Sequence, residues 1–217
     1  MAIASDRPPR RIAARASDTP PPARGAGQEA VTNAAREIFA ERGYHGTSIR
    51  DIAKHAGLSL SALYYWYSSK QELLAALIEE ADVDYHARCE RALAAVGDKP
   101  VDRLRALVRA TVEYRVERRL ESSIVARESR NLEPESIKRM ASHAREATKM
   151  WADVIDDGVQ RKAFRCAHPD DARRTVIAAC NAIAQWYNPD GEITVADLVD
   201  RYTDIAFRVV DVRTTKR

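Results

Sequence analysis

The stretch from Thr47 to Lys70, TSIRDIAKHAGLSLSALYYWYSSK, decides the fold. Its apolar residues predict a short helix that begins after Thr47 or Ser48, either of which can cap it, and ends at Gly57 after barely two turns. A second short helix follows Ser59, which is placed to cap it. Two short helices joined by a glycine-containing turn predict a helix-turn-helix.

The residues on either side extend this pattern. Before it, an apolar stripe predicts a helix with one buried face that ends at Gly43. After it, Ser69 and Glu72 fit a capping box at the start of a fourth helix. The preceding stripe consists of Val31, Ala34, Ala35, Ile38 and Phe39.

The exposed side of the predicted second short helix favours DNA binding over an ordinary helical hairpin. Its side chains are mostly short, so the helix can approach base edges closely, while residues beside it can reach phosphates. The residues placed toward bases are Ser59, Leu60, Ser61, Ala62 and Tyr64. Those placed toward flanking phosphates are Thr47, Tyr64, Trp66 and Lys70, with Ser48 beside Thr47 at the helix start.

These 50 or so residues resemble the DNA-binding head of the tetracycline-repressor (TetR) family of bacterial transcription regulators. The matching segments are Phe39 to Tyr44, Thr47, Asp51 to Ala53, Ala56 to Ser59, Leu63-Tyr64, Lys70 and Glu72-Leu73. The resemblance implies that Tyr64 and Lys70 contact phosphates and that the exposed side of residues 59–64 reads bases. Trp66 stands where histidine is common in the family, and Tyr67 stands where phenylalanine is common. The indole N–H of Trp66 is still a hydrogen-bond donor.

Charge restricts how DNA affinity can arise. The chain of 217 residues carries a net charge of +3. Residues 1–27 hold five arginines against two aspartates, which is also +3, so the rest is neutral overall. Affinity must therefore come from a few placed contacts. The same tail is rich in proline, and we expect it to be disordered. It is either an arginine arm that follows the DNA or a solvated leader without a role.

Nothing in the sequence predicts export or membrane insertion. The tail lacks the apolar core of a secretory signal, and the longest aliphatic run, Leu73 to Ile78, cannot span a bilayer. Three cysteines without a close pair suit a reducing cytosol. We expect a cytoplasmic protein.

Helical periodicity continues to the end of the chain and predicts an all-α fold. We expect a tail at 1–27, a helix-turn-helix head at 28–75, a helical effector-binding and dimerisation domain at 76–212, and a short tail at 213–217. Further helices are expected from Lys70 into the 90s, from Val101 to about Arg130 with a break near Arg118, and from Pro134 to about Gly158.

Two amphipathic helices close the chain, at about 170–187 and 194–212. Such a pair either covers its own core or pairs with a second copy in a four-helix bundle. We favour the homodimer, partly because the family resemblance implies it.

The middle of the chain is the predicted effector site. Residues 128–135, Gly158 with Phe164, and residues 186–191 resemble segments of TetR members that answer to acyl-CoA thioesters. An apolar slot would be walled by Tyr114, Ile124, Met150, Trp151 and Cys180. Arg127 or Arg130 would hold the CoA phosphates. The alternative is that the apolar residues are plain core and the arginines lie on a solvated face.

Catalysis is not predicted. Cys166 and His168 have no acid or oxyanion hole nearby, the histidines lack metal-ligand spacing, and no glycine-rich phosphate loop occurs. No cofactor is expected. The sequence predicts a regulator, favoured as a repressor, that a small molecule releases from operator DNA. The alternative is a helical ligand-binding or scaffold protein whose helix-turn-helix no longer binds DNA.

Overall fold

The computed structural model describes residues 26–213, apart from the side chains of residues 142–144. The expectations for the tails therefore fall almost entirely outside the described residues. Across the described part the chain is helical, and the all-α prediction is confirmed. The helices are α1 (Ala26–Arg42), α2 (Ile49–His55), α3 (Leu60–Trp66), α4 (Lys70–Ala94), α5 (Pro100–Glu117), α6 (Arg119–Glu128), the 3₁₀ turn η1 (Ser129–Asn131), α7 (Pro134–Gln160), α8 (Pro169–Trp186) and α9 (Val195–Val209).

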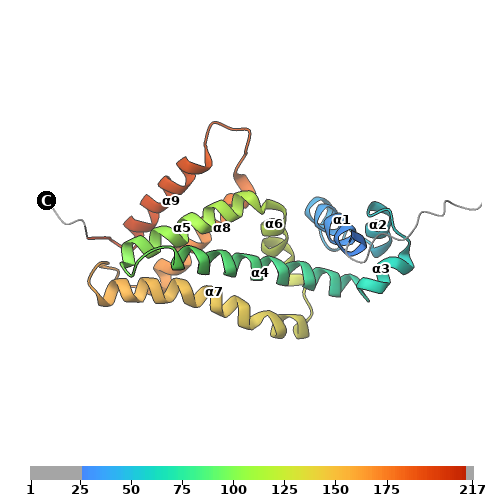
Figure 1. The fold of residues 1–217 in the computed structure, drawn as a ribbon, viewed down its shortest axis with the longest axis horizontal. Helices are drawn as coiled ribbons and strands as arrows, with labels where there is room; N and C mark the ends of the chain where they lie inside the picture. Colours follow the sequence, from blue (N-terminus) through green and yellow to red (C-terminus); the bar gives the residue numbers. More distant parts are fainter. Residues whose placement is uncertain (1–25, 214–217) are drawn as a thin grey trace, which may run out of the picture.

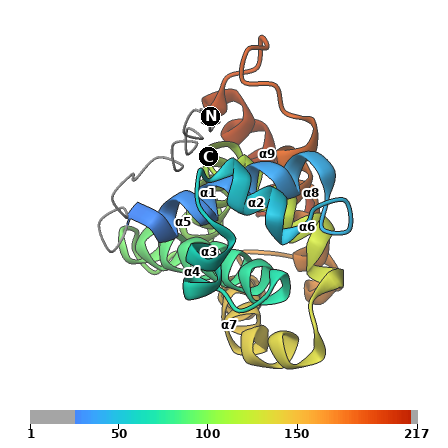
Figure 2. The same cartoon turned by 90° about the vertical axis from the view of Figure 1, so that its right-hand side faces the viewer.

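The molecule is elongated, with a small head at one end and a larger body at the other (Figure 1). Helices α1, α2 and α3 form the head. Helix α4 begins at the head and runs into the body, where α7 lies alongside it. Viewed along the long axis, α1 to α3 lie in front of the body (Figure 2). The head therefore projects α2 and α3 away from the body.

Local signals set the helix ends. Ser48, Ser59, Ser69 and Thr194 each accept a hydrogen bond from a backbone N–H in the first turn of the helix that follows. Ser48, rather than Thr47, is thus the cap of α2. The predicted box at Ser69 is only half formed, because the Glu72 carboxylate bonds to the backbone N–H and hydroxyl of Ser68 instead. These two bonds lower the pKa of Glu72 below its usual value.

Two glycines make the turns of the head. Gly43 follows α1 with φ of 72°, and Gly57 follows α2 with φ of 68°. Both values lie in the left-handed region that side chains with a Cβ resist. The expected helix break near Arg118 is also present, since that residue leaves helical geometry with φ of −107° and ψ of 49°. This break separates α5 from α6.

The buried apolar residues form two clusters. The head cluster joins α1, α2 and α3 to the first half of α4, and it also takes in Ile124, Leu132 and Met140 from the body. The body cluster lies among α4, α5, α7, α8 and α9. Residues of α6, of the segment that follows η1, and of α7 thus share the head's own core. Within residues 26–213, no helix is long and apolar enough to cross a membrane.

Candidate DNA-binding head and effector cavity

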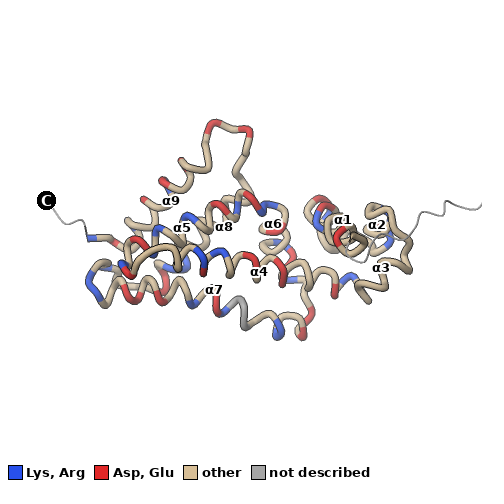
Figure 3. Tube along the Cα trace, viewed as in Figure 1, with Lys and Arg blue, Asp and Glu red and all other residues tan. Residues whose placement is uncertain are grey.

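Helix α3 presents an exposed, uncharged surface. Ser59, Ser61, Tyr64 and Tyr65 are exposed, and Tyr65 is the most open at 73%. Figure 3 shows no acidic or basic residue along α3. This surface has the small and hydroxyl-bearing side chains that suit close approach to a groove. The sequence-based prediction omitted Tyr65, although its position four residues after Ser61 placed it on the same helix face.

The remaining residues predicted on α3 are less exposed to solvent. Leu60, Ala62 and Trp66 are half-buried, and Leu60 and Trp66 pack against the head cluster. The ring of Tyr65 stands edge-on to Trp66, with centroids 4.7 Å apart. Trp66 therefore helps to hold Tyr65 in place.

Thr47 and Lys70 are held by contacts inside the head. Thr47 is only 3% exposed, and its hydroxyl donates to the carbonyl of Gly43 at 2.8 Å. The predicted phosphate contact by the Thr47 hydroxyl does not fit this geometry. The Lys70 ammonium donates to the carbonyls of Tyr44 at 2.8 Å and Thr47 at 2.7 Å, and lies 4.0 Å from the centre of the Tyr44 ring. One of its three N–H donors remains for a phosphate.

Other groups on α2 point to solvent. Ser48 is exposed at the start of α2, and its hydroxyl bonds to Asp51. Arg50, in the first turn, is also exposed and forms no ion pair with another described residue. Arg50 is a cation that the sequence-based prediction missed. The sequence did indicate that Arg50 is exposed, because it lies on the opposite side of the helix from the apolar stripe of Ile49, Ile52 and Ala53.

The turn between α6 and α7, in the body, forms hydrogen bonds with the head and with α4. Asn131 accepts at its Oδ1 from His45 Nε2, 3.0 Å away, and donates from Nδ2 to the buried Glu128 carboxylate at 2.7 Å. Its backbone carbonyl accepts from Gln71 at 2.6 Å. A Cβ on Gly43 would lie 3.3 Å from Glu128 Oε1. We call residues 128–133 the linking turn, because it joins α6 to α7 and contacts both α4 and the loop after α1.

A cavity of about 770 Å³ opens beside the linking turn. It lies between α4, the linking turn, α7 and α8. Its apolar residues are Ile78, Leu132, Ile137, Met140, Ala141 and Ala152; its polar residues are Asp82, Ser129, Arg130, Arg145, Thr148, Lys149 and Arg173. Arg173 pairs with Asp170 at 2.9 Å, and its Nε–H is buried without a partner among the described residues. The cavity therefore offers an apolar surface together with several cations. We call it the effector cavity, because it is the candidate site for the effector that the sequence predicts.

Of the residues predicted for the effector, only Arg130 lines this cavity. Tyr114, Trp151 and Cys180 are buried in the body cluster, and Met150 packs against it. Tyr114 donates to the carbonyl of Ala81, and Trp151 donates to the hydroxyl of Tyr85. Burial raises the pKa of Cys180 to about 12, as expected of an enclosed thiol. These residues lie in the core and do not line the effector cavity, so the slot among them stays a prediction.

The last two predicted positions, both on α6, contact the head. Ile124 is buried in the head cluster. The guanidinium of Arg127 donates to the carbonyl of Ala40 in α1, so it is turned away from the effector cavity. Arg127 thus links α6 to the head, and of the two arginines predicted for CoA phosphates only Arg130 is suitably placed.

Two family models match the chain. Residues 31–77 match the bacterial regulatory proteins of the tetR family. Residues 97–210, more than half of the chain, match the tetracyclin repressor-like C-terminal domain. The chain belongs to the TetR family. It is therefore a DNA-binding transcription regulator of a ligand-responsive type, and not an enzyme.

Two similar proteins are regulators from Mycobacterium tuberculosis and Mycolicibacterium smegmatis. The chain is 27% identical over 173 residues to the HTH-type transcriptional repressor KstR2 of Mycobacterium tuberculosis, covering 79% of this chain and 86% of KstR2. It is 27% identical over 176 residues to the HTH-type transcriptional activator FasR of Mycolicibacterium smegmatis, covering 80% of this chain and 78% of FasR.

Known structures show the same fold. A TetR-family regulatory protein from Rhodococcus RHA1 superposes with a TM-score of 0.82 at 26% identity, covering 88% of this chain and all of that one. The structure of the ketosteroid transcriptional regulator KstR2 of M. tuberculosis gives a TM-score of 0.76 at 26% identity, covering 88% and 97%. TetR regulators bind operator DNA and dimerise, and these properties extend to this chain.

Proposed function

We propose that this TetR protein is a homodimeric repressor whose α3 helices bind operator DNA, and that an acyl-CoA thioester in the effector cavity releases it. The observation that carries the proposal is the double role of the linking turn. Ser129, Arg130 and Leu132 line the cavity. Asn131 bonds to His45 of the head, and the Glu128 carboxylate that Asn131 holds lies beside Gly43. A ligand that displaces one side of the turn also displaces the other.

The cavity chemistry favours an amphipathic anion. The apolar residues suit an acyl chain, whereas Arg130, Arg145 and Lys149 suit phosphates. The unpartnered Nε–H of Arg173 suits a carbonyl or phosphate oxygen, because a buried donor without an acceptor is costly. KstR2 is described as a ketosteroid regulator, which agrees with a bulky apolar effector. A protein of the same fold, AibR, has been solved with isovaleryl coenzyme A and operator DNA, and that likeness concerns the fold alone.

Dimerisation through α8 and α9 is the arrangement that the exposed apolar residues favour. Ile205 on α9 and Trp186 at the end of α8 are 44% and 48% exposed. Tyr202 and Val209 on α9 are half-buried. Pairing these helices with their copies would cover this surface in a four-helix bundle.

The regulatory mechanism is a two-state one. In the free dimer the two α3 helices are spaced for successive major grooves, about 34–36 Å apart. Effector binding stabilises a body conformation in which this spacing is lost. A switch from mostly bound to mostly released requires about a 10⁴-fold difference in effector affinity between the two states.

Adjacent arginines on α8 provide the test. Arg173 and Arg174 each pair with the aspartate three residues before, at 2.9 and 2.8 Å, but only Arg173 lines the effector cavity. We expect Arg173→Gln to raise the CoA-thioester concentration that releases operator DNA by about tenfold. Arg174→Gln, the matched control, should leave it unchanged.

Gel shifts with the chain's own upstream DNA, and thermal shifts with CoA thioesters of varied chain length, supply the measurements. Stabilisation by a drug-like aromatic but by no CoA thioester would overturn the proposed effector. The absence of any salt-sensitive, sequence-selective gel shift would favour a helical ligand-binding or scaffold protein instead.

A further inference from the structure

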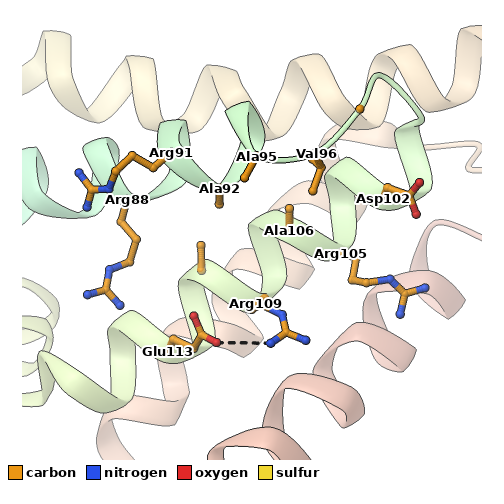
Figure 4. A pocket seen from close by; sticks show the side chains of 12 residues that line it. Arg88, Arg91, Ala92, Ala95, Val96, Asp102, Arg105, Ala106, Arg109 and Glu113 are labelled. Carbon is orange, nitrogen blue, oxygen red and sulfur yellow. Dashed lines mark ion pairs between the residues drawn. The ribbon is translucent and has the colours of Figure 1, made fainter.

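A second cavity, of about 720 Å³, lies between the C-terminal half of α4 and α5. It is separate from the effector cavity. Asp82 of the effector cavity and Arg91 of this one are about two and a half helical turns apart on α4, which places them on opposite faces. Figure 4 shows Arg88 and Arg91 extending from α4, and Arg105 and Arg109 extending from α5. We call this cavity the arginine groove.

The groove carries an excess of positive charge. Four guanidinium groups and two carboxylates, those of Asp102 and Glu113, line it; Glu117, just outside the lining, pairs with Arg88, and one positive charge remains in excess. The chain outside its first 27 residues is neutral overall, so the positive charge of the groove is a local excess and not a share of a generally basic surface. A concave site with low-dielectric walls strengthens the field of such charges and attracts anions.

Two of the four arginines retain their hydrogen-bonding capacity. Arg88 pairs with Glu117 at 2.7 Å, and Arg109 lies 3.7 Å from Glu113. The guanidinium groups of Arg91 and Arg105 form no ion pair or hydrogen bond with another described residue. Arg105 is nevertheless positioned, because its guanidinium lies 5.0 Å from the centre of the Phe207 ring. Two planar guanidinium groups are thus available for bidentate contacts to phosphate.

The floor of the groove is made of small residues. Ala92, Ala95, Val96 and Gly97 line it from α4 and the turn after α4, while Ala106 and Ala110 line it from α5. A floor without long side chains leaves a flat apolar surface beside the arginines. Such a surface suits a planar ring, while the arginines suit a phosphate chain. The volume is in the range of natural small-molecule sites.

We infer that the arginine groove binds a ligand in which a diphosphate is joined to a flat ring system, as in a nucleoside diphosphate. The diphosphate lies between Arg91, Arg105 and Arg109, and the ring lies on the alanine floor. This unit occurs in a free nucleoside diphosphate and in the nucleotide end of coenzyme A. The inference does not rest on the proposed effector, because none of the groove residues lines the effector cavity.

Isothermal titration of the full-length dimer in low-salt buffer tests the site with ADP, AMP and coenzyme A. We expect ADP to bind more tightly than AMP, and its affinity to fall with added salt. Arg91→Gln and Arg105→Gln should each weaken ADP binding by about tenfold. Arg103→Gln is the control, because it removes the same charge from α5 at a position that does not line the groove.

A variant that binds ADP more tightly is a second test, because misfolding cannot explain a gain in affinity. Glu113→Gln removes the carboxylate beside Arg109 and should tighten ADP binding by about threefold, since one opposing charge near a surface anion site is lost. Competition then identifies the source of the diphosphate. Coenzyme A that displaces ADP supports the CoA nucleotide as a natural occupant, whereas binding of ADP alone supports a free nucleotide.

Three outcomes would overturn the inference. The wild-type protein could bind neither ADP nor coenzyme A. Arg91→Gln and Arg103→Gln could weaken ADP binding equally, which would indicate nonspecific attraction. Arg91→Gln could dissociate the dimer in light scattering without affecting ADP binding, in which case the groove contacts the partner subunit. Effector-induced operator release, measured separately with Arg173→Gln, distinguishes failure here from failure of the proposed function.

Discussion

His45 and Asn131 are 86 residues apart in sequence, and their side chains share a hydrogen bond of 3.0 Å between Nε2 and Oδ1. Because Asn131 Nδ2 donates to Glu128, its Oδ1 is the acceptor and His45 Nε2 must carry the proton. The bond joins the loop after α1 to the linking turn. It is therefore a direct contact between the DNA-binding head and the wall of the effector cavity.

Asn131→Ala should reduce the coupling between effector and operator. The variant loses the bonds to both His45 and Glu128, so displacement of the linking turn is transmitted less well to the head. We expect the factor by which effector lowers operator affinity to fall about fivefold, or about 1 kcal/mol of coupling free energy. Fluorescence anisotropy with labelled operator measures it, and Asn188→Ala in the turn between α8 and α9 is the control.

A double-mutant cycle of His45→Ala with Asn131→Ala then isolates their shared contribution. An unchanged effector response in Asn131→Ala, with an unchanged melting temperature, would show that coupling runs through another route.

Lys70→Met should weaken both the fold of the head and DNA binding. Methionine keeps the apolar stem but loses the two bonds to the carbonyls of Tyr44 and Thr47. Hydrogen bonds to charged groups contribute about 2 kcal/mol, so thermal unfolding should be measurably easier. If the third N–H binds a phosphate, the slope of log affinity against log salt should also fall by about 0.9. A lower melting temperature with an unaltered slope would leave Lys70 a purely structural role.

Gly57 substitutions should destabilise the head in proportion to their resistance to positive φ. The position is sterically open, since an added Cβ would meet no atom within 4 Å. Backbone conformation alone therefore sets the cost, which is about 1 kcal/mol for Gly57→Ala, less for Gly57→Asn and more for Gly57→Val. Chemical denaturation gives the order. Equal stability of the alanine and asparagine variants would argue against a left-handed turn in solution.

Operator recognition should depend strongly on thymine methyl groups. Helix α3 lacks arginine, asparagine and glutamine, so the usual bidentate contacts to guanine and adenine are not available from it. Its remaining contacts are hydroxyl groups and the apolar side chains of Leu60 and Ala62. Replacing a contacted thymine by deoxyuridine should weaken binding about fourfold, the value of one buried methyl group. Deoxyuridine scanning without any effect would exclude this mode of recognition.

Much of the fold could be predicted because its signals are local. The stripe of α1, the glycines at 43 and 57, and the serine caps each act over a few residues, and the break at Arg118 interrupts a visible periodicity. The head surface was predicted in part for the same reason. Tyr64 and Ser61 are exposed as expected, whereas the burial of Thr47 depends on the fold of the loop after α1.

The effector cavity could not be located from sequence. Trp151 and Ala152 are neighbours on α7, yet one fills the core and the other lines the cavity. Hydrophobicity does not distinguish these roles, because both require apolar side chains. The contacts of Asn131 with His45 and Gln71 join segments far apart in the chain, and no short-range pattern marks them.

The ring of Phe164 occupies the space that a side chain on Gly158 would need, with ring carbons 2.1 Å from the Cβ position. Phe164 also pairs with Val212 just beyond α9. Phe164 thus joins the end of α7, which lines the effector cavity, to the end of α9, the helix proposed to pair the subunits. With the proposed α9 pairing, bending α7 around an occupant would strain the junction between protomers, so the effector concentration needed for operator release should vary with the abundance of the regulator itself.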